Sequence, residues 1–244
     1  MDHPFAEPSD TRQAILGAAF RALCEHGYAN VTIKRIGDEF DKSPSLVYHH
    51  YDGKDELLID LLEFLLAEFE TSIAGEQRPK SGDSDSAVDP SEPFDRSARE
   101  QLDGYLTATT DPESIDDEYA PDARFFTVMT ELRSQAANNE AYRDHFDRSD
   151  RVFSEYLESI VREAAVEVAA EDAADGSSGP DPGAETVDPA EVAATLQTFA
   201  TGSTFRATTT TETAWIDGAR AGIDRYLESV LPLVDPDAGA ENET

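Results

Sequence analysis

Apolar side chains recur at helical spacing along most of the chain. In residues 11–26 they fall three or four positions apart, and residues 54–75 repeat the pattern with leucine and phenylalanine. The same period continues in residues 95–110, 122–140, 142–173, 189–211 and 212–231. Such a repeat is typical of amphipathic α-helices, and with two short helices between residues 33 and 50 it predicts an all-α fold of about nine helices. We find no strand pattern and no internal repeat.

Three segments lack this period and are rich in proline, glycine, serine and acidic residues. They are residues 79–93, residues 175–188 and the tail from residue 235. Segments of this composition have little apolar surface to bury and are typical of linkers. We therefore expect breaks in the packed structure at these three places, with a disordered acidic tail over residues 235–244.

The first predicted helix has a signal at each end. Ser9 or Asp10 precedes it, and both are residue types that cap a helix N-terminus by accepting a backbone N–H bond. Gly27 follows it, at the position where a residue with positive φ usually ends a helix. The sequence thus predicts a helix that begins after residue 10 and stops at Gly27.

A second, shorter helix is predicted over residues 33–40. Thr32 is its expected N-cap. Val31 and Ile36 stand at the two positions where apolar side chains form a hydrophobic staple across a helix start. The spacing therefore predicts where this helix begins, and Ile33, Ile36 and Phe40 are expected to be buried.

A third helix is expected to begin at Ser43. Pro44 occupies its first turn, where a missing N–H costs nothing. Leu46 and Val47 can pack inward. Two short helices that cross at a wide angle, the second with polar and aromatic tips, have the geometry that fits a major groove. The outward tips are Ser45, Tyr48, His49 and His50.

The segment from Thr32 to Leu57 resembles the DNA-binding domain of the TetR/AcrR family of regulators. It reads TIKRIGDEFDKSPSLVYHHYDGKDEL, and its cap, turn, tyrosine and lysine agree in register with the family pattern. The resemblance covers about a fifth of the chain, and a match in full register is far more specific than a short motif. It implies a helix-turn-helix domain over residues 1–53 and a helical ligand-sensing and dimerisation domain over residues 54–234.

The resemblance also implies roles for individual residues. Thr32, Tyr48 and Lys54 are expected to contact phosphate, which fixes the register of a protein on DNA, while Ser45 and His49 are expected to face base edges. Two positions depart from the family pattern: Asp41 replaces the usual glycine of the turn, and Lys42 replaces an apolar residue. The full set of DNA-binding candidates is Thr32, Lys34, Lys42, Ser43, Pro44, Ser45, Tyr48, His49, His50 and Lys54.

Charge changes the picture of how DNA is bound. The chain has 52 acidic and 19 basic residues and a formal net charge of −33. The first 56 residues contain ten acidic and six basic residues, so they carry −4 and the remaining 188 carry −29. At molar salt the Debye length falls to about 3 Å, which removes most of the self-repulsion. We therefore predict a halophile's protein, as in halophilic archaea, whose DNA binding survives molar KCl because few counterions are released.

Other function classes lack support in the sequence. Cys24 is the single cysteine, and His49 and His50 are adjacent on a helix and cannot converge on one ion, so we expect no metal and no cofactor. The first ten residues lack a basic and an apolar region, and acidic residues break the stretch from Leu57 to Phe69. We thus expect a cytoplasmic protein without a signal peptide or membrane partner. With no catalytic constellation, we expect no enzyme.

The second domain offers candidates for ligand binding and for dimerisation. Aromatic residues are densest in residues 124–133, where Arg133 would suit a carboxylate ligand or could equally pair with a surface glutamate. The pocket candidates are Tyr105, Phe125, Phe126, Met129, Arg133 and Phe199; an aromatic stripe can equally be plain core. The resemblance implies that the last two helices build a homodimer interface, with candidates Leu196, Ala200, Gly202, Ser203, Trp215, Ala219, Gly222, Ile223 and Tyr226; alternatively these helices close the subunit's own core.

Together these observations predict a dimeric repressor that binds a palindromic operator in double-stranded DNA and responds to an unknown small-molecule effector. A two-fold dimer places two recognition helices symmetrically, which is why the operator is expected to be a palindrome. An activator, an effector-independent regulator and a helical ligand-binding or adaptor protein without DNA binding stay open as alternatives.

Overall fold

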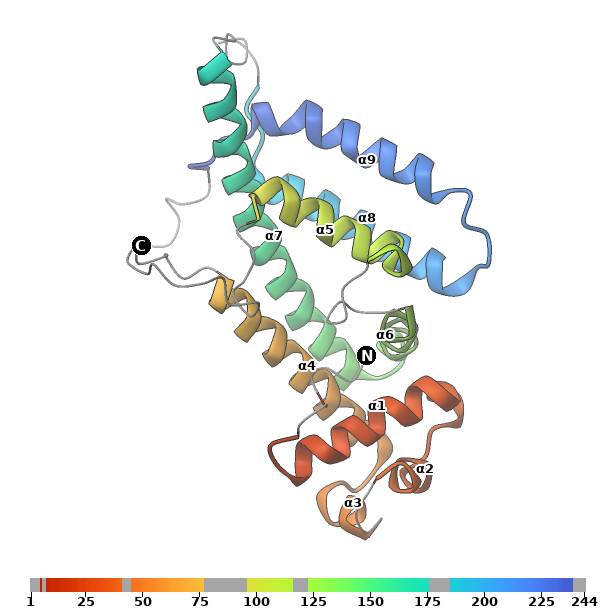
Figure 1. Cartoon of the computed structure of the whole chain (residues 1–244). Helices are drawn as coiled ribbons and strands as arrows, with labels where there is room; N and C mark the ends of the chain where they lie inside the picture. Colours follow the sequence, from red (N-terminus) through yellow and green to blue (C-terminus); the bar gives the residue numbers. More distant parts are fainter. Residues whose placement is uncertain are drawn as a thin grey trace, which may run out of the picture. The chain divides into compact units, whose positions relative to one another are not determined.

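The computed structural model describes residue 5 and residues 8–40, 45–76, 96–115, 123–175 and 185–238. Helices dominate these ranges, which confirms the all-α prediction, and none of the described helices is long and apolar enough to cross a membrane (Figure 1). The helices are α1 (Thr11–Asn30), α2 (Ile33–Asp38), α3 (Ser45–His50), α4 (Lys54–Glu76), α5 (Ala98–Thr110), α6 (Ala123–Gln135), α7 (Glu140–Asp175), α8 (Pro189–Thr209) and α9 (Ile216–Val230), with short 3-10 helices η2 (Pro112–Ser114) and η3 (Leu231–Leu233).

The chain divides into two compact units. Unit 1 comprises Met1–Arg78 and Asp116–Asp150, and unit 2 comprises Pro79–Ile115 and Arg151–Thr244. The division between them falls inside α7. Unit 1 therefore contains α4, α6 and the first part of α7 in addition to the three N-terminal helices. The compact units thus do not divide at the predicted domain boundary after residue 53. The functional boundaries of the two domains stay a prediction.

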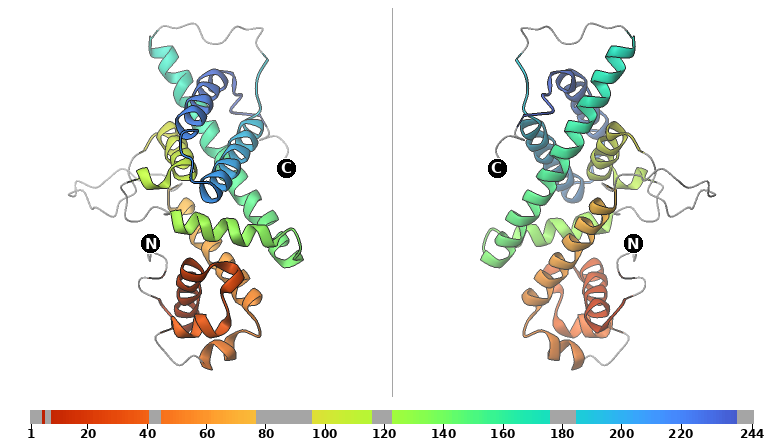
Figure 2. Two further views of the ribbon diagram at one scale, coloured as in Figure 1. Left: turned by 90° about the vertical axis from the view of Figure 1, so that its right-hand side faces the viewer. Right: turned by 90° about the vertical axis from the view of Figure 1, so that its left-hand side faces the viewer.

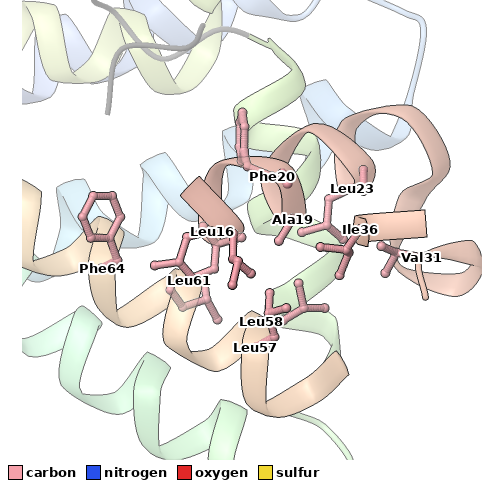
Figure 3. Packing of buried hydrophobic residues seen from close by; sticks show 14 of the residues in the cluster. Leu16, Ala19, Phe20, Leu23, Val31, Ile36, Leu57, Leu58, Leu61 and Phe64 are labelled. Atoms are coloured by element: carbon pink, nitrogen blue, oxygen red, sulfur yellow. The ribbon is translucent and has the colours of Figure 1, made fainter. Parts of the chain in front are cut away.

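Unit 1 is built around α1, which packs against α2, α4 and α6. Its core is a cluster of aliphatic and aromatic side chains that are almost completely buried (Figure 3). Leu16 and Leu23 from α1 point toward Leu57, Leu58 and Leu61 from α4 in this close view. The three- and four-residue spacing of these leucines in the sequence places each set on one helix face, which is why the two faces meet.

The ends of α1 follow the sequence signals. Asp10 is the N-cap, and its side chain accepts the backbone N–H of Gln13. Gly27 has φ 68°, a backbone conformation that a side chain disfavours, and it kinks the helix. The helical hydrogen-bond pattern resumes beyond the kink as far as Asn30, where the prediction ended the helix at Gly27.

Unit 2 is organised around α5, which packs against α8 and α9 (Figures 1 and 2). A capping box opens α5: Ser97 accepts the N–H of Glu100, and the Glu100 side chain accepts the N–H of Ser97. Glu167 from α7 adds a second anchor, because its carboxylate accepts the backbone N–H of Ala98 at 2.9 Å. Leu102, Leu106 and other apolar residues of this unit form a second core, separate from that of unit 1.

Two predicted linker segments contain ordered structure at their ends. Val187 pairs with Val234 in an isolated parallel bridge, where Val187 N–H donates to the Leu233 carbonyl at 2.8 Å. Asp188 caps α8 by accepting the N–H of Ala190. In the predicted disordered tail, the Ala238 carbonyl accepts a hydrogen bond from Arg162. The linker prediction for residues 79–93 lies outside the described residues.

A buried histidine joins α4 and α7 within unit 1. The side chain of His145 is 3% exposed, and its Nδ1 lies 2.8 Å from Oε1 of Glu63. Glu63 also pairs with Arg148, one turn further along α7. Burial lowers the pKa of His145 to about 4, although the nearby Asp150 carboxylate acts in the opposite direction. The folded protein therefore keeps His145 neutral at pH values where a solvated histidine is charged.

This burial predicts a pH-dependent loss of stability. Below about pH 6.5 the unfolded chain takes up a proton at His145 that the folded protein binds only near pH 4, so stability falls as the pH is lowered through this window. Between pH 7 and pH 5, we expect the wild type to lose about 2 kcal/mol more than His145→Gln, which cannot titrate. Denaturant unfolding at both pH values measures the difference, and parallel pH profiles for the two proteins would refute it.

Candidate nucleic-acid interface

The beginning of α2 has the predicted capping geometry. The Thr32 side chain accepts the backbone N–H of Arg35 at 3.2 Å, so Thr32 is the N-cap. Val31 and Ile36 are both almost completely buried in the core of unit 1. These contacts confirm the cap and place both residues of the predicted staple in the same core. The helix ends at Asp38, two residues earlier than predicted, while Phe40 stays buried beyond its end.

Helix α3 buries one side and exposes the other. Val47 is completely buried, and Leu46 packs against the same core. On the opposite side Tyr48 is 61% exposed, and His49 and His50 are exposed as well. Ser45, the first residue of α3, is also exposed. The candidates Lys42, Ser43 and Pro44 lie outside the described residues, as does the predicted start of this helix.

Two lysines predicted to bind DNA differ in their surroundings. Lys34 is exposed on α2. Lys54, the first residue of α4, is half-buried, and its ammonium group donates to the carbonyl oxygen of Tyr28 at 3.0 Å. The same ammonium lies 4.0 Å from the centre of the Tyr28 ring, a distance suited to a cation–π contact. Lys54 therefore binds the end of α1 in this structure, and its phosphate contact stays a prediction.

The start of α4 is tied to α1 and to the end of α3 by a second polar cluster. Arg12 donates to both carboxylate oxygens of Asp60, and the hydroxyl group of Tyr51 donates to the same carboxylate at 2.5 Å. Burial opposes ionisation of Asp60, but the hydrogen bonds from Arg12 and Tyr51 prevail and lower its pKa. The cluster fixes the segment that leaves α3, and its partners are too far apart in sequence to be found by spacing.

A further contact missed by the sequence analysis lies at the α1 kink. The backbone N–H of Tyr28 donates to Oε2 of Glu131, a residue of α6, at 2.7 Å. A Cβ atom placed on Gly27 would lie 3.0 Å from Oε1 of the same carboxylate. Gly27 thus provides both the positive φ and the space that this carboxylate occupies. The glycine was found by its helix-ending position, whereas Glu131 carries no signal in the sequence.

This geometry predicts opposite effects for two glycine substitutions. Gly27→Ala is expected to destabilise the protein by about 1–3 kcal/mol, because alanine disfavours positive φ and its Cβ crowds the Glu131 carboxylate. Gly104→Ala, in the middle of α5 with no atom near its Cβ, is expected to stabilise by about 0.5–1 kcal/mol. Chemical denaturation of the two variants tests the pair; a neutral or stabilising Gly27→Ala would contradict the strain argument.

The six ligand-pocket candidates fall into both units. In unit 1, Phe125 and Met129 pack against the core, and the Phe126 ring meets that of Phe125 edge-on. Arg133 pairs with Asp150 at 2.9 Å, so its acidic partner is an aspartate and not the glutamate expected as the alternative to a carboxylate ligand. In unit 2 the remaining candidates, Tyr105 and Phe199, pack against its core. Their role as a ligand pocket stays a prediction.

Unit 2 also contains an apolar groove that none of these candidates lines. Its walls come from the second half of α7, including Ala165 and Val168, and from Leu231, Pro232 and Val234 near η3. Val166 at its edge is 55% exposed. Nothing in the sequence indicated this groove. The groove forms because the segment after α9, from Leu231 to Val234, packs beside α7.

The dimer-interface candidates separate into buried and accessible residues. Leu196, Ala200, Ser203 and Ile223 are buried within the single chain, and two of them, Leu196 and Ile223, belong to the core of unit 2. Their place in a dimer interface stays a prediction. The others retain accessible surface: Gly202, Trp215, Ala219, Gly222 and Tyr226. Phe205 on α8 is 58% exposed, and its neighbour Arg206 lies over the Trp215 ring at 4.7 Å. Phe205 is thus the large apolar side chain most exposed on the surface of α8 and α9, which we call the predicted dimer face.

Within the described residues, no group of three or more histidine, cysteine, aspartate or glutamate side chains could hold a metal ion.

Comparison with known proteins identifies the N-terminal segment. Residues 15–61 match the family model described as bacterial regulatory proteins, tetR family. This range includes α2, α3 and the first third of α4. The transcriptional repressor AcnR from Corynebacterium glutamicum is 36% identical over 55 residues, which make up 22% of this chain and 29% of the repressor. The chain thus aligns with less than a third of the length of this relative.

Solved structures are similar over a much larger part of the chain. A TetR transcription regulator from Haloarcula marismortui has a TM-score of 0.63 and 27% identity, with 91% of this chain and 98% of that chain covered. A structure from Saccharomonospora viridis, described as a transcriptional regulator in complex with choline, has a TM-score of 0.60 and 18% identity. It covers 90% of this chain and 96% of that chain, and at this identity it shows a shared fold alone.

Proposed function

The chain belongs to the TetR family of bacterial regulatory proteins, and from that premise we propose that it is a transcriptional repressor that binds a palindromic operator as a homodimer and is released by a small-molecule effector. The observation that supports DNA binding most directly is the exposed side of α3, where Tyr48, His49 and His50 project from a helix whose other side is buried. The major groove of DNA is wide enough to admit an α-helix such as α3.

The contacts fall into two classes. Thr32 and Tyr48 bind phosphate and fix the orientation of α3, whereas Ser45 and His49 read base edges. Tyrosine and threonine hydroxyl groups are neutral donors, so these contacts release few counterions. Affinity then depends on geometry more than on net charge, and a chain with a net charge of −33 can bind DNA in molar salt.

The accessible residues of α8 and α9 support the proposed homodimer. A single helix-turn-helix binds too few bases for useful affinity, and a two-fold dimer doubles the contacts and makes the operator an inverted repeat. Release requires that the effector bind one conformation of the dimer more tightly than the other, since a ligand with equal affinity for both shifts nothing. Because such a protein acts on DNA, we expect it in the cytoplasm.

A titration of the purified full chain against a labelled inverted repeat in about 2 M KCl tests this function, since that salt concentration screens long-range charge. We expect two chains to bind each duplex, and a duplex with half of the repeat to bind much more weakly. A stoichiometry of one chain per duplex would refute the dimeric arrangement. In a transcription reaction with the repeat placed over the promoter, added protein is expected to lower transcript yield; a rise would indicate an activator.

A further inference from the structure

The end of α1 contains a backbone donor that the helix itself cannot satisfy. The kink at Gly27 interrupts the helical backbone conformation of α1, and the next N–H, that of Tyr28, donates to a side chain outside this helix. Its partner is the carboxylate of Glu131, at 2.7 Å, on a helix more than a hundred residues later in the chain. A backbone N–H without a hydrogen-bond partner costs free energy when it is shielded from water. The kinked backbone therefore requires an acceptor at this position, and Glu131 supplies it.

Two further hydrogen bonds hold Tyr28. Its carbonyl oxygen accepts a hydrogen bond from Lys54, and its hydroxyl group donates to Oδ1 of Asp55 at 2.9 Å. The hydroxyl group of Tyr142, a completely buried residue of α7, donates to the same oxygen at 3.2 Å. Tyr28 thus accepts a hydrogen bond from α4 and donates hydrogen bonds to α4 and α6. It shares the Asp55 carboxylate with Tyr142 of α7. All of these residues lie in unit 1.

The position of Tyr28 in the chain gives this network its significance. Val31 and Thr32 follow within four residues, and the first is buried while the second caps α2. Fixing Tyr28 therefore fixes the connection between α1 and α2, and with it the helix that precedes α3. Apolar contacts between α1 and α6, such as that of Phe20 with Phe125, tolerate sliding, whereas a hydrogen bond fails over about 1 Å.

We propose that Glu131 is a positioning residue for DNA binding: its carboxylate bonds to the Tyr28 N–H and thereby holds the α1–α2 connection in the orientation that lets α3 enter the groove. This inference rests on the proposed function and adds a residue of α6, outside the helix-turn-helix, to the determinants of affinity. Glu131 touches no DNA in this account, and it acts only through Tyr28 and Gly27.

Three substitutions at position 131 separate the hydrogen bond from the charge. Glu131→Gln keeps an acceptor oxygen at the same reach, and it is expected to bind DNA within about threefold of the wild type. Glu131→Asp keeps the charge but is one methylene shorter, and Glu131→Ala removes the acceptor. Both are expected to weaken DNA binding by about tenfold or more in 2 M KCl, where long-range charge is screened.

Glu167→Ala is the matched control. The carboxylate of Glu167 also accepts a backbone N–H, that of Ala98, but Glu167 lies in unit 2. Its removal changes the net charge by the same amount as Glu131→Ala and is expected to leave DNA affinity within about threefold of the wild type. Hydrogen–deuterium exchange adds a local readout: the amide of Tyr28 is expected to exchange faster in the Ala and Asp variants and at the wild-type rate in the Gln variant.

Each outcome decides a separate point. Equal DNA affinity of Glu131→Ala and Glu167→Ala would overturn the positioning role, and so would a Gln variant as weak as the Ala variant. If Glu131→Ala fails to fold, the other two variants still test the positioning role, because the Asp variant loses the hydrogen bond to the Tyr28 N–H and the Gln variant retains it. A wild-type protein that binds no DNA sequence would instead remove the proposed function itself.

Discussion

Phe205→Glu is expected to convert the dimer into a monomer and to weaken binding to an inverted-repeat DNA by about 100-fold or more. Phe205 is 58% exposed on α8, so the single chain gains little by displaying it to water. In a two-fold dimer the residue occurs twice, and each copy of the variant would bury a charge without a partner. Light scattering measures the mass of the particle, and the DNA titration measures the affinity.

Val166→Glu provides the matched control for this prediction. Val166 is similarly exposed, at 55%, but it lies on α7 and not on the predicted dimer face. The substitution adds the same charge, so it accounts for any repulsion from DNA or between subunits. We expect it to leave both mass and DNA affinity unchanged. A Phe205→Glu protein that remains dimeric would show that α8 and α9 only close the core of the subunit.

Tyr48→Ala is expected to weaken DNA binding by about 30-fold while leaving the fold intact. Loss of about 1 kcal/mol at each half-site, summed over the two half-sites of a dimer, corresponds to this factor. The side chain is 61% exposed, and its removal leaves no cavity in the core. Thermal unfolding checks the fold, and the DNA titration gives the affinity.

The variant Tyr48→Phe distinguishes the hydroxyl group from the ring. If the hydroxyl group binds phosphate, the phenylalanine variant loses most of the affinity that the alanine variant loses, and equally so for every DNA sequence. If the ring packs against sugar or bases, the phenylalanine variant binds as the wild type does. Wild-type affinity in Tyr48→Ala would remove α3 from the interface altogether.

Local signals predicted much of the fold. The cap at Thr32, the positive φ of Gly27 and the leucine faces of α1 and α4 depend on residues close together in the chain, and each lies where the spacing placed it. The boundaries were less accurate where side chains from elsewhere decide them. The predicted helix over residues 122–140 ends at Gln135, where the Arg143 side chain of α7 binds the carbonyl of Ala136.

The polar contacts of unit 1 could not be predicted from spacing. The partners of Tyr28 lie 27 and 103 residues away, and His145 meets Glu63 across 82 residues. In a chain with 52 acidic residues, no single glutamate or aspartate stands out, so the sequence could not indicate which carboxylates bind a backbone N–H or a buried histidine. The structure distinguishes them by burial and geometry.

The same limit applies to the dimer face. Spacing placed Leu196, Ala200, Ser203 and Ile223 on the faces of α8 and α9, but it could not tell which side of a helix meets the subunit's own core. The structure shows that these four residues are buried within the single chain. The accessible residues of the same helices keep the dimer prediction open to the test with Phe205.

Selection of bound sequences from a random pool of double-stranded DNA by the purified full chain in about 2 M KCl tests the central claim most directly, because non-specific attraction between charges is then almost fully screened. We expect enrichment of an inverted repeat, and recovery of less DNA with the same repeat by a Tyr48→Ala protein carried through the same rounds. A pool without any enriched sequence would contradict it and would favour a helical ligand-binding or adaptor protein that does not bind DNA.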